Sequence, residues 1–471
     1  MYNQTLQEKY PHLEISVLKL SEAQKDNESK RIDSEFFKKE YFDAMETIQL
    51  NQVEYLSDNT KFNSRYSQPK YDETSKMKVI NSQYIRNEYI DYENAKSGYG
   101  KIVPKESVLI NATGIGTLGR VFINILDFDF SIDSHINIIV VKNKTYLNPY
   151  FLTIFLQSYY GQIQIIRYYS GTSGQIEIYP RDFNYFKIPI FSMEFQLEIE
   201  KMVKDSHKAL EESKELYKKA EEILYNELGL DPKNPLQSLL NSKTNNSTNS
   251  PNISIRTLKE SFLKTGRLDS EYYQSKYEDI ENFIKSYSNG YDSFLNIINN
   301  KDTNFTPKNN ENYNYIELAN IGNNGNINEP ISDLGKNLPT RARRIVSNGD
   351  VIISSIEGSL SSCALITQEF DKHLVSTGFF VLNSKLLNSE TLLVMFKSQI
   401  FQEYLKKFPS GTILCAINKE ELSKIFIPKI DPTTQEKIAK YIQESFNLRK
   451  KSKQLLDNAK IKVEEQIQGK V

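Results

Sequence analysis

The chain has 471 residues, with 59 Lys and Arg against 60 Asp and Glu, and only two cysteines and four histidines. This length accommodates two or more domains, while the cysteine and histidine counts exclude a disulfide framework and zinc-type spacing. The first residues lack the basic and apolar regions of a signal peptide, and no apolar run reaches the roughly 18 residues of a membrane helix. We therefore expect a cytoplasmic protein that binds no membrane and no metal. The net charge of −1 neither favours nor excludes nucleic acid.

The main feature of the sequence is a repeat with a very long period. The segment RIDSEFF at 31–37 returns as RLDSEYY at 267–273, 236 residues later. The tripeptide Ser-Gly-Thr at 170–172 returns at 410–412, and Ile188-Pro189 returns at 427–428, in the same order. Solenoid repeats have periods of only tens of residues, so this repeat predicts two duplicated domains.

Each half mixes strand-like runs, such as 108–110 and 136–141, with polar turns, which indicates an α+β domain. Polar stretches at 57–74 and 299–314 are predicted to be loops inside these domains. The segment 231–253 is rich in Asn, Ser, Thr and Pro, which is typical of a linker. In chain order we predict an N-terminal segment (1–30), a first domain (31–190), a long helix (193–229), the linker (231–253), a second domain (254–430) and a second long helix (433–468).

Both long helices carry a heptad seam of apolar and small side chains. The serines and the alanine of the first seam return in register in the second, and only Arg449 interrupts it. We predict that the two helices pack on each other as an antiparallel coiled-coil spacer; the alternative is that each covers the core of its own domain. The seam residues are Ile199, Val203, Ser206, Leu210, Ser213, Ala220, Ile438, Ile442, Ser445, Ser452, Leu456 and Ala459.

One motif is typical of cofactor binding, but the residues that follow it argue against such a site. The glycines of 114–119 spell G-x-G-x-x-G after a predicted strand, as in dinucleotide-binding sites. Residues 120–125, however, have the pattern of a strand, whereas phosphate binding by this motif needs a helix N-terminus there. A glycine turn between strands is therefore predicted.

A nucleophile and base pair is a second possibility, because Cys363 lies ten residues before His373. The pair occurs in one half only, and a buried or incidental thiol is the more common explanation. The sequence also lacks a Walker loop, a serine nucleophile elbow and a methyltransferase N-P-P-[FY] tetrapeptide. We therefore predict no catalytic residue.

Polar, aromatic and basic stretches precede both long helices at 167–175 and 406–412, and a basic cluster occupies 341–344. Arg, Lys, Ser and Thr hold phosphates, while Arg, Asn and Gln can read base edges. Singly, such stretches are more often solvated turns, but their repetition at matching positions favours DNA contact. The candidate DNA-binding residues are Arg120, Arg167, Tyr168, Ser170, Thr172, Ser173, Gln175, Arg341, Arg343, Arg344, Lys407, Ser410 and Thr412.

The doubled order of these features resembles the specificity subunit of type I restriction-modification systems. Each half has the R-x-D-x-E-[FY]-[FY] motif, a variable domain, the Ser-Gly-Thr turn, an Ile-Pro pair and a long helix that opens with Gln-x-x-Ile, at Gln196 and Gln435. The resemblance covers nearly the whole chain. It implies two target-recognition domains, each reading one half of a split double-stranded DNA site, with the paired helices holding them apart and also docking methyltransferase subunits.

The resemblance also implies the partners. Specificity subunits have no catalysis of their own and bind no cofactor; two methyltransferase (modification) subunits and a restriction/translocase subunit are expected to bring S-adenosylmethionine, ATP and magnesium. Two alternatives stay open at this point: a specificity subunit of a related type II (IIB-like) restriction-methylation complex, and a non-DNA coiled-coil interaction scaffold. Protection of a split DNA sequence in the presence of a methyltransferase subunit distinguishes the scaffold from the others.

Overall fold

The computed structural model describes residues 5–15, 17–171, 174–241, 255–411 and 414–470. It divides into two compact units: unit 1 comprises residues 1–210 and 450–471, and unit 2 comprises residues 211–449. Among the residues described, none of the helices combines the length and apolar character that a membrane crossing requires. The unit boundaries fall inside the two long helices, α7 (Met193–Glu227) and α15 (Pro432–Ile467), so each unit contains a segment of both.

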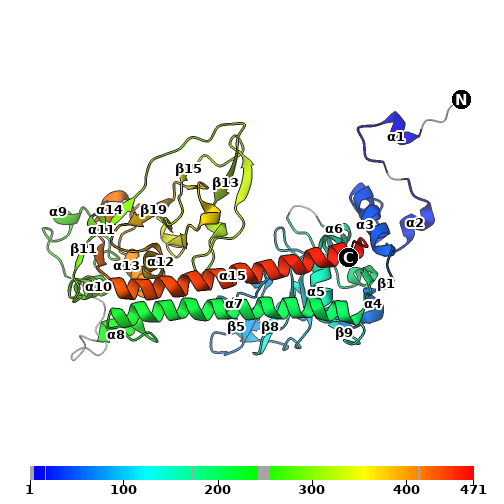
Figure 1. Ribbon diagram of the computed structural model, residues 1–471, viewed down its shortest axis with the longest axis horizontal. Helices are drawn as coiled ribbons and strands as arrows, with labels where there is room; N and C mark the ends of the chain where they lie inside the picture. The colour runs from blue at the N-terminus through cyan, green and yellow to red at the C-terminus, as the bar shows by residue number, and fades with distance from the viewer. Residues whose placement is uncertain (1–4, 16, 172–173, 242–254, 412–413, 471) are drawn as a thin grey trace. The chain divides into compact units, whose positions relative to one another are not determined.

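Unit 1 mixes short helices and strands, in agreement with the α+β prediction (Figure 1). Before α7, its elements are α1 (Leu6–Lys9), α2 (Leu20–Gln24), η1 (Ser34–Phe37), α3 (Lys39–Gln49), β1 (Val53–Tyr55), α4 (Leu56–Asn59), β2 (Thr60–Arg65), β3 (Lys70–Tyr71), β4 (Lys78–Ile80), η2 (Ser82–Tyr84), β5 (Lys96–Tyr99), β6 (Val108–Asn111), β7 (Val121–Ile123), β8 (Phe130–Ile132), β9 (Ile136–Val141), α5 (Pro149–Gln157), α6 (Tyr159–Tyr168), η3 (Asp182–Tyr185) and β10 (Lys187–Pro189), where η is a 3-10 helix.

Unit 2 repeats much of this order. Its elements between the long helices are α8 (Pro235–Asn241), α9 (Phe262–Thr265), α10 (Ser275–Lys285), β11 (Tyr291–Ser293), α11 (Phe294–Ile297), β12 (Ile298–Asn300), β13 (Asn312–Ile316), η4 (Leu318–Asn320), β14 (Ile331–Leu334), β15 (Ala342–Ile345), β16 (Val351–Ser354), η5 (Glu357–Ser359), β17 (Cys363–Leu365), η6 (Gln368–Phe370), β18 (Leu374–Ser376), β19 (Phe379–Ser384), α12 (Ser389–Lys397), α13 (Gln399–Leu405), α14 (Lys419–Ser423) and β20 (Phe426–Pro428).

The two units share their sheet topology. Each has an antiparallel sheet, ordered β2-β9-β6-β7 in unit 1 and β12-β19-β16-β17 in unit 2. Each also has a second sheet with one parallel pair, β4 with β8 in unit 1 and β13 with β18 in unit 2. A two-stranded ribbon, β1 with β10 or β11 with β20, brings the Ile-Pro pair beside the start of each domain. The polar stretches predicted to be loops contain β2, β3, β12 and part of β13, which pair with more apolar strands.

The central strand of each first sheet separates two hydrophobic clusters. Val108 and Ile110 of β6 contact the cluster that includes α5, while Leu109 contacts the cluster of the second sheet. In unit 2, Ile353 and Ile352 divide in the same way. Alternate residues of a strand point to opposite faces, so burial on both faces explains why these strands are apolar throughout.

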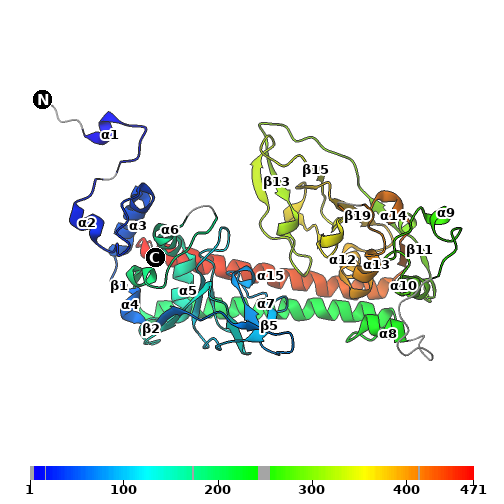
Figure 2. The same cartoon turned by 180° about the vertical axis from the view of Figure 1, so that it is seen from behind.

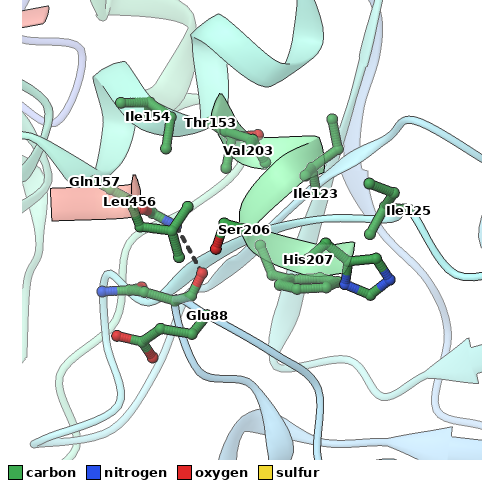
Figure 3. A pocket seen from close by; sticks show the side chains of 12 residues that line it. Glu88, Ile123, Ile125, Thr153, Ile154, Gln157, Val203, Ser206, His207 and Leu456 are labelled. Carbon is green, nitrogen blue, oxygen red and sulfur yellow. Dashed lines mark hydrogen bonds between the residues drawn. The ribbon is translucent and has the colours of Figure 1, made fainter. Parts of the chain in front are cut away.

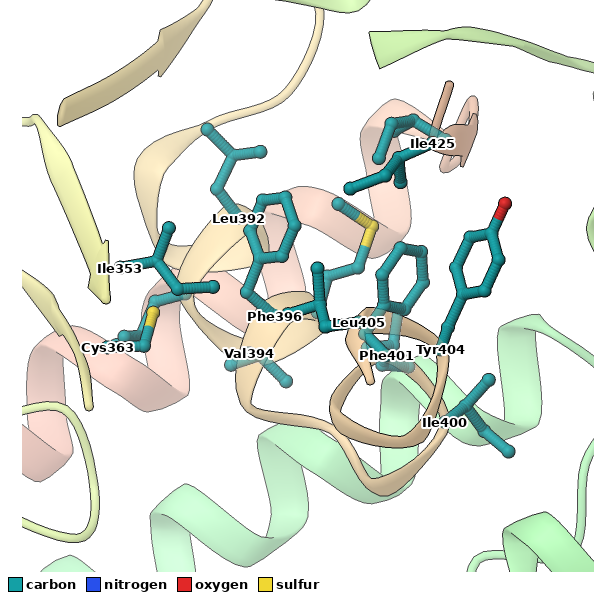
Figure 4. Close-up of a cluster of buried hydrophobic side chains, with 14 of the residues drawn as sticks. Ile353, Cys363, Leu392, Val394, Phe396, Ile400, Phe401, Tyr404, Leu405 and Ile425 are labelled. Carbon is teal, nitrogen blue, oxygen red and sulfur yellow. The ribbon is translucent and has the colours of Figure 1, made fainter. Parts of the chain in front are cut away.

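Helices with apolar sequences cover one face of each first sheet. Asn148 caps helix α5, because its side chain accepts hydrogen bonds from the amides of Tyr150 and Phe151, and Pro149 is in the first turn. Helix α5 contacts β6 and β7. Figure 2 shows α5 among the elements of unit 1, seen from behind. In unit 2 the matching cluster includes Phe396 and Phe401 of α12 and α13 (Figure 4).

Candidate nucleic-acid interface

Ser170 and Glu177 stand at the two ends of a short segment of unit 1 in which Gly171, Gly174 and Gln175 are exposed. The amides of Ser170 and Glu177 each donate a 2.8 Å hydrogen bond to the other's carbonyl, which closes the loop at its base. Gly171 has a φ of +113°, and a Cβ at this position would lie 2.1 Å from the carbonyl oxygen of Gln175. Only glycine tolerates both constraints. Gln175 is exposed, whereas Thr172 and Ser173 lie outside the described residues.

Unit 2 builds the corresponding loop between Ser410 and Ala416. Reciprocal main-chain hydrogen bonds of 3.0 and 3.1 Å close it. Gly411 has a φ of +129°, and an added Cβ would lie 2.8 Å from the carbonyl oxygen of Leu414. Thr412 lies outside the described residues. The Ser-Gly-Thr repeat therefore marks a matching loop in each unit, which we call the SGT loops (170–177 and 410–416).

An arginine of the repeated motif holds the first SGT loop at its base. The Nη1 of Arg31 donates to the main-chain carbonyls of Tyr169 (2.7 Å) and Arg167 (3.2 Å). The same guanidinium donates to both carboxylate oxygens of Asp33 and lies 5.0 Å from the ring centre of Phe36. The hydrogen bond from Arg31 lowers the pKa of Asp33.

Arg267 does the same in unit 2. Its guanidinium donates to the carbonyls of Pro409 (2.8 Å) and Phe408 (3.2 Å) and to both oxygens of Asp269. It lies 4.5 Å from the ring centre of Tyr272. We call the R-x-D-x-E-[FY]-[FY] motif the arginine bracket. Its arginine binds the base of the loop, its aspartate orients the arginine, and its aromatic ring packs against the guanidinium.

The glycine turn lies directly beside the SGT loop of unit 1. The amide of Gly114 donates to the carbonyl of Ile176 at 3.0 Å. The turn is followed by β7, as predicted, so the helix that a dinucleotide site needs is replaced by a strand. In unit 2 the amide of Glu357 donates to the carbonyl of Cys415 at 3.0 Å. This bond places the turn after β16 beside the SGT loop of unit 2.

Three of the predicted DNA-binding side chains are engaged inside their own units. The guanidinium of Arg167 lies 4.6 Å from the ring centre of Phe36, and burial lowers its pKa. The hydroxyl of Tyr168 donates to the carbonyl of Asp26 at 3.0 Å, and Lys407 forms a 2.5 Å ion pair with Glu281. These contacts give the three side chains a role in packing within their own units, and their role in DNA binding stays a prediction.

The other predicted side chains differ in how far they are exposed. In unit 2, Arg341 and Arg343 are exposed, and Nε of Arg343 donates to the carbonyl of Thr340 at 2.8 Å. Arg344 donates to the carbonyl of Phe379, and burial lowers its pKa. Ser170 and Ser410 are half-buried, and their main-chain hydrogen bonds close the SGT loops. Arg120 is half-buried beside the glycine turn.

A buried glutamine joins each domain to the start of its following helix. The side chain of Gln196 accepts from the amide of Asn148 (2.7 Å) and donates to the carbonyls of Tyr146 (3.0 Å) and Phe191 (2.9 Å). Gln435 makes the same three bonds, to the amide of Asn388 and to the carbonyls of Leu386 and Ile430, at 2.8, 3.0 and 2.9 Å. The Gln-x-x-Ile opening thus fixes the direction in which α7 and α15 leave their domains.

The seam residues predicted on the two helices are buried in both units. In unit 1, Ser206 Oγ donates to the carbonyl of Ser452 at 2.9 Å and lies 2.9 Å from its Oγ. In unit 2, Ser445 Oγ donates to the carbonyl of Ser213 at 2.7 Å. Each unit's core contains seam residues of both helices, Ile199, Val203, Leu456 and Ala459 in unit 1 and Ala220, Ile438 and Ile442 in unit 2.

One basic residue beside this interface was missed by sequence reasoning. Arg86 lies in the hairpin after η2 and approaches Arg120, 34 positions away, through a shared hydrogen-bond acceptor. The signal was weak, because a single arginine between Ile85 and Asn87 has no periodicity or motif. Only the strand pairing of the folded domain brings the two arginines together.

Among the described residues there is no group of three or more His, Cys, Asp and Glu side chains placed to hold a metal ion. Burial raises the pKa of the Cys363 thiol to about 12, which disfavours a nucleophilic thiolate. A cavity of about 20 Å³ in unit 1 is lined by Gln157, Ser206 and Leu456 among others (Figure 3), and has room for a water molecule only.

Comparison with known proteins identifies relatives of one kind. Residues 43–222 match the family model of the type I restriction modification DNA specificity domain. The type I restriction enzyme HindI specificity subunit of Haemophilus influenzae is 30% identical over 159 residues, which cover 33% of this chain and 33% of that protein. The match therefore spans about a third of the length of this curated relative.

Two solved structures of the same description share low sequence identity with the chain. The type I restriction-modification S subunit from M. genitalium is 13% identical, with 88% of this chain and 95% of that chain covered and a TM-score of 0.40. The HsdS subunit from Thermoanaerobacter tengcongensis is 14% identical, with coverage of 89% and 97% and a TM-score of 0.28.

Proposed function

We propose that this chain, whose residues 43–222 match the family model of the type I restriction modification DNA specificity domain, reads the two halves of a split double-stranded DNA target. The observation that carries the proposal is the duplicated SGT loop. Both units hold the loop with the same arginine bracket, while the side chains beside it differ. A common support that carries unlike surface residues is what two readers of different half-sites require.

The proposed interface of each unit consists of its SGT loop, the adjoining strand-connecting turn and the basic residues nearby. In unit 1 these are Gln175, Gly116 and Arg120, and in unit 2 they include Arg341 and Arg343. Guanidinium and amide side chains form paired hydrogen bonds with base edges, and main-chain amides of exposed turns bind phosphates. Thr172, Ser173 and Thr412 of the loops belong to this proposal by sequence position.

We further propose that α7 and α15 form an antiparallel coiled-coil spacer between the two readers. The support comes from the serine contacts within each unit and from ion pairing of Lys462 with Glu198 in unit 1. A helix rises about 1.5 Å per residue, so inserting one heptad in each helix would add roughly 10 Å, close to three base pairs of B-DNA. The tolerated distance between half-sites would therefore be a property of these helices.

Duplicated exposed apolar side chains support the docking of two copies of one partner. Val17 and Ile255, Leu20 and Leu258, and Ile32 and Leu268 occupy matching sequence positions, and each is between 63% and 93% exposed. Apolar surface repeated in both units favours a protein partner present twice. We propose that this partner is the methyltransferase subunit. In this proposal it brings S-adenosylmethionine, while a restriction/translocase subunit brings ATP and magnesium, and the chain performs no chemistry itself.

The test is a footprint of the purified complex. The full chain, co-expressed with its cognate methyltransferase subunit, is expected to protect two short DNA segments separated by an unprotected spacer. A second form carries seven-residue helical insertions after Leu210 in α7 and after Arg449 in α15, the last residues before the chain passes from one unit to the other. It is expected to protect the same half-sites about three base pairs further apart.

Three outcomes would contradict the proposal. A chain that forms no complex with the methyltransferase, or a complex that protects one continuous segment, is inconsistent with a two-headed reader. An insertion that changes the half-site sequences instead of their separation is inconsistent with a spacer. Methylation mapped to two adenines, one in each half-site, would be independent support.

A further inference from the structure

Two arginines of unit 1 converge on a single main-chain oxygen. Arg86 and Arg120 donate from Nη1 to the carbonyl of Ile85, at 3.0 and 3.3 Å. Both side chains are half-buried, and neither forms a salt bridge with any described acidic residue. Burial and, secondly, the charge of Arg86 lower the pKa of Arg120, while Glu88 and Tyr89 act in the opposite direction. Two like charges held this close favour a ligand that supplies hydrogen-bond acceptors.

The backbone that carries this arginine pair is held by hydrogen bonds. The amide of Arg86 donates to the carbonyl of Tyr89 at 2.9 Å, which closes a short hairpin. Asn87 ties that hairpin to the first sheet, because its side chain accepts from the amide of Val121 at 2.9 Å. Its carbonyl accepts from Gln157 at 3.0 Å (dashed line in Figure 3). Both guanidiniums therefore start from fixed backbone, which reduces the entropy lost on binding.

The pair stands beside the proposed DNA-binding surface. Arg120 directly follows the glycine turn, whose first glycine donates to Ile176 of the SGT loop. A Cβ added at Gly116 would meet nothing within 4 Å, so the tip of this turn is open. A DNA strand that contacts Gln175 and this turn therefore comes within reach of Arg120 and its neighbour Arg86.

Unit 2 lacks the pair at the matching positions. The amide of Asn111 donates to the carbonyl of Arg120, and the amide of Ser354 donates to the carbonyl of Ser362, both at 2.9 Å, so Ser362 replaces Arg120. Ile85 forms a β-bridge with Ile90 in unit 1, and Ile321 forms one with Ile327 in unit 2. Arg86 follows Ile85 and Gly322 follows Ile321, so Gly322 occupies the position of Arg86. The bracket arginines and clamp glutamines repeat, whereas this pair belongs to unit 1 alone.

We propose that Arg86 and Arg120 together bind a guanine of the half-site read by unit 1, donating to its O6 and N7 in the major groove. The inference rests on the proposed DNA-reading function. Arginine donors match the two acceptors of guanine, and this contact distinguishes guanine from the other three bases. A phosphate contact would serve both half-sites equally and would be expected in the repeated framework, whereas the pair occurs in one reader only.

The experiment uses the full complex and synthetic duplexes that carry both half-sites. Each guanine of the first half-site is replaced in turn by 7-deazaguanine, which lacks the N7 acceptor. For the wild-type chain, one replacement is expected to weaken binding about tenfold or more. Arg86→Gln and Arg120→Gln are expected to weaken binding to normal DNA by a similar factor and to be insensitive to the same replacement. Lys61→Ala, an exposed lysine of unit 1, is the matched control and should retain the wild-type response.

Folding of the variants is checked by protection of the second half-site, which should be unchanged, and by Arg120→Lys, which keeps the charge but loses the paired donors. A uniform loss across all sequences with a smaller dependence on salt would identify a phosphate contact and overturn the proposal. Variants that behave like Lys61→Ala, or a first half-site without guanine, would overturn it as well. A wild-type complex that protects no split site would instead refute the proposed function itself.

Discussion

Arg31 donates a 2.7 Å hydrogen bond from its guanidinium to the main-chain carbonyl of Tyr169, the residue before the SGT loop of unit 1. Arg267 makes the equivalent bond to Pro409 in unit 2. The most recognisable sequence repeat of the chain is therefore a device for holding a loop, more than 130 residues away, in a defined position. Its value to the protein lies in preorganisation, because a fixed loop loses less entropy when it binds DNA.

Removing this bracket should affect one half-site at a time. In Arg31→Ala the loop base loses a charged donor, whose hydrogen bonds are worth about 1.5–3 kcal/mol each. Binding to DNA that carries only the first half-site should weaken about tenfold or more, while binding to the second half-site should change little. Arg267→Ala should show the opposite pattern. The measurement is the dissociation constant of the full complex for duplexes with one intact half-site.

Arg31→Lys is the matched control for charge, since lysine retains the cation but cannot donate simultaneously to Asp33 and the loop with the geometry of a planar fork. It should behave more like Arg31→Ala than like the wild type. Equal weakening of both half-sites by either substitution would show that the bracket acts on overall stability and would contradict the positioning role.

The sequence was sufficient to predict features with a strong local pattern. The heptad seams predict two long helices, and the strand-like residues after Gly119 predict β7 in place of a phosphate-binding helix. The motif 31–37 and the SGT tripeptide were visible as repeats, but the contact between them was not. It depends on long-range folding, which periodicity and composition do not encode.

The errors have physical causes of the same kind. Residues 60–65 look like a loop because Thr, Lys, Asn, Ser and Arg dominate them, yet they form β2 by pairing with the apolar strand β9. Arg167 is predicted from sequence to contact DNA because it precedes the SGT loop; in the structure its guanidinium packs on Phe36, and contact with DNA stays a prediction. Arg and Lys side chains pack on aromatic rings as readily as they bind phosphates, so sequence alone cannot separate the two uses.

The buried glutamine clamp should have a large effect on stability. Gln196→Leu removes three hydrogen bonds and leaves the amide of Asn148 and two carbonyls without their partner, at a cost of about 3 kcal/mol or more. Gln435→Leu should cost a similar amount in unit 2. Urea unfolding of the full chain, followed by circular dichroism, measures both values.

Gln83→Leu provides the comparison, because the side chain of Gln83 is exposed on η2. It should change the free energy of unfolding by no more than about 0.5 kcal/mol. If Gln196→Leu is as mild as this control, then the clamp contributes little and apolar packing alone directs α7 away from its domain.

The Arg31–Asp33 pair should contribute to the acid sensitivity of unit 1. The hydrogen bond from Arg31 holds the pKa of Asp33 below its ordinary value of 3.8. A lowered pKa stabilises the folded state at pH values above that of the unfolded group, and this stabilisation is lost as pH falls through the folded value. The side chain of Asp33 is 47% exposed, so solvent screening limits the contribution to about 1 kcal/mol or less.

The difference in unfolding free energy between the wild type and Asp33→Asn isolates this contribution. It should be constant from pH 7 to about 5 and shrink below pH 4. Asp133 and Asp182, whose pKa values are raised by burial, act in the opposite sense but are present in both proteins and cancel in the difference. A difference that grows as the pH falls would mean that the pair does not stabilise the charged carboxylate.

The contact between Ser206 and Ser452 provides a direct test of helix pairing. Their side-chain oxygens lie 2.9 Å apart within the buried seam of unit 1, and Ser206 also donates to the carbonyl of Ser452. In a double-mutant cycle with Ser206→Ala and Ser452→Ala, the two hydroxyls should show a coupling of about 1 kcal/mol, with the double variant less destabilised than the sum of the single ones. The pair Ser213 and Ser445 should give a similar value in unit 2. A cycle of Ser206→Ala with Ser67→Ala, an exposed serine of unit 1, should be additive within about 0.5 kcal/mol. If the seam pairs are also additive, the two helices are not held together through these serines, and the coiled-coil spacer would have to depend on the apolar seam residues alone.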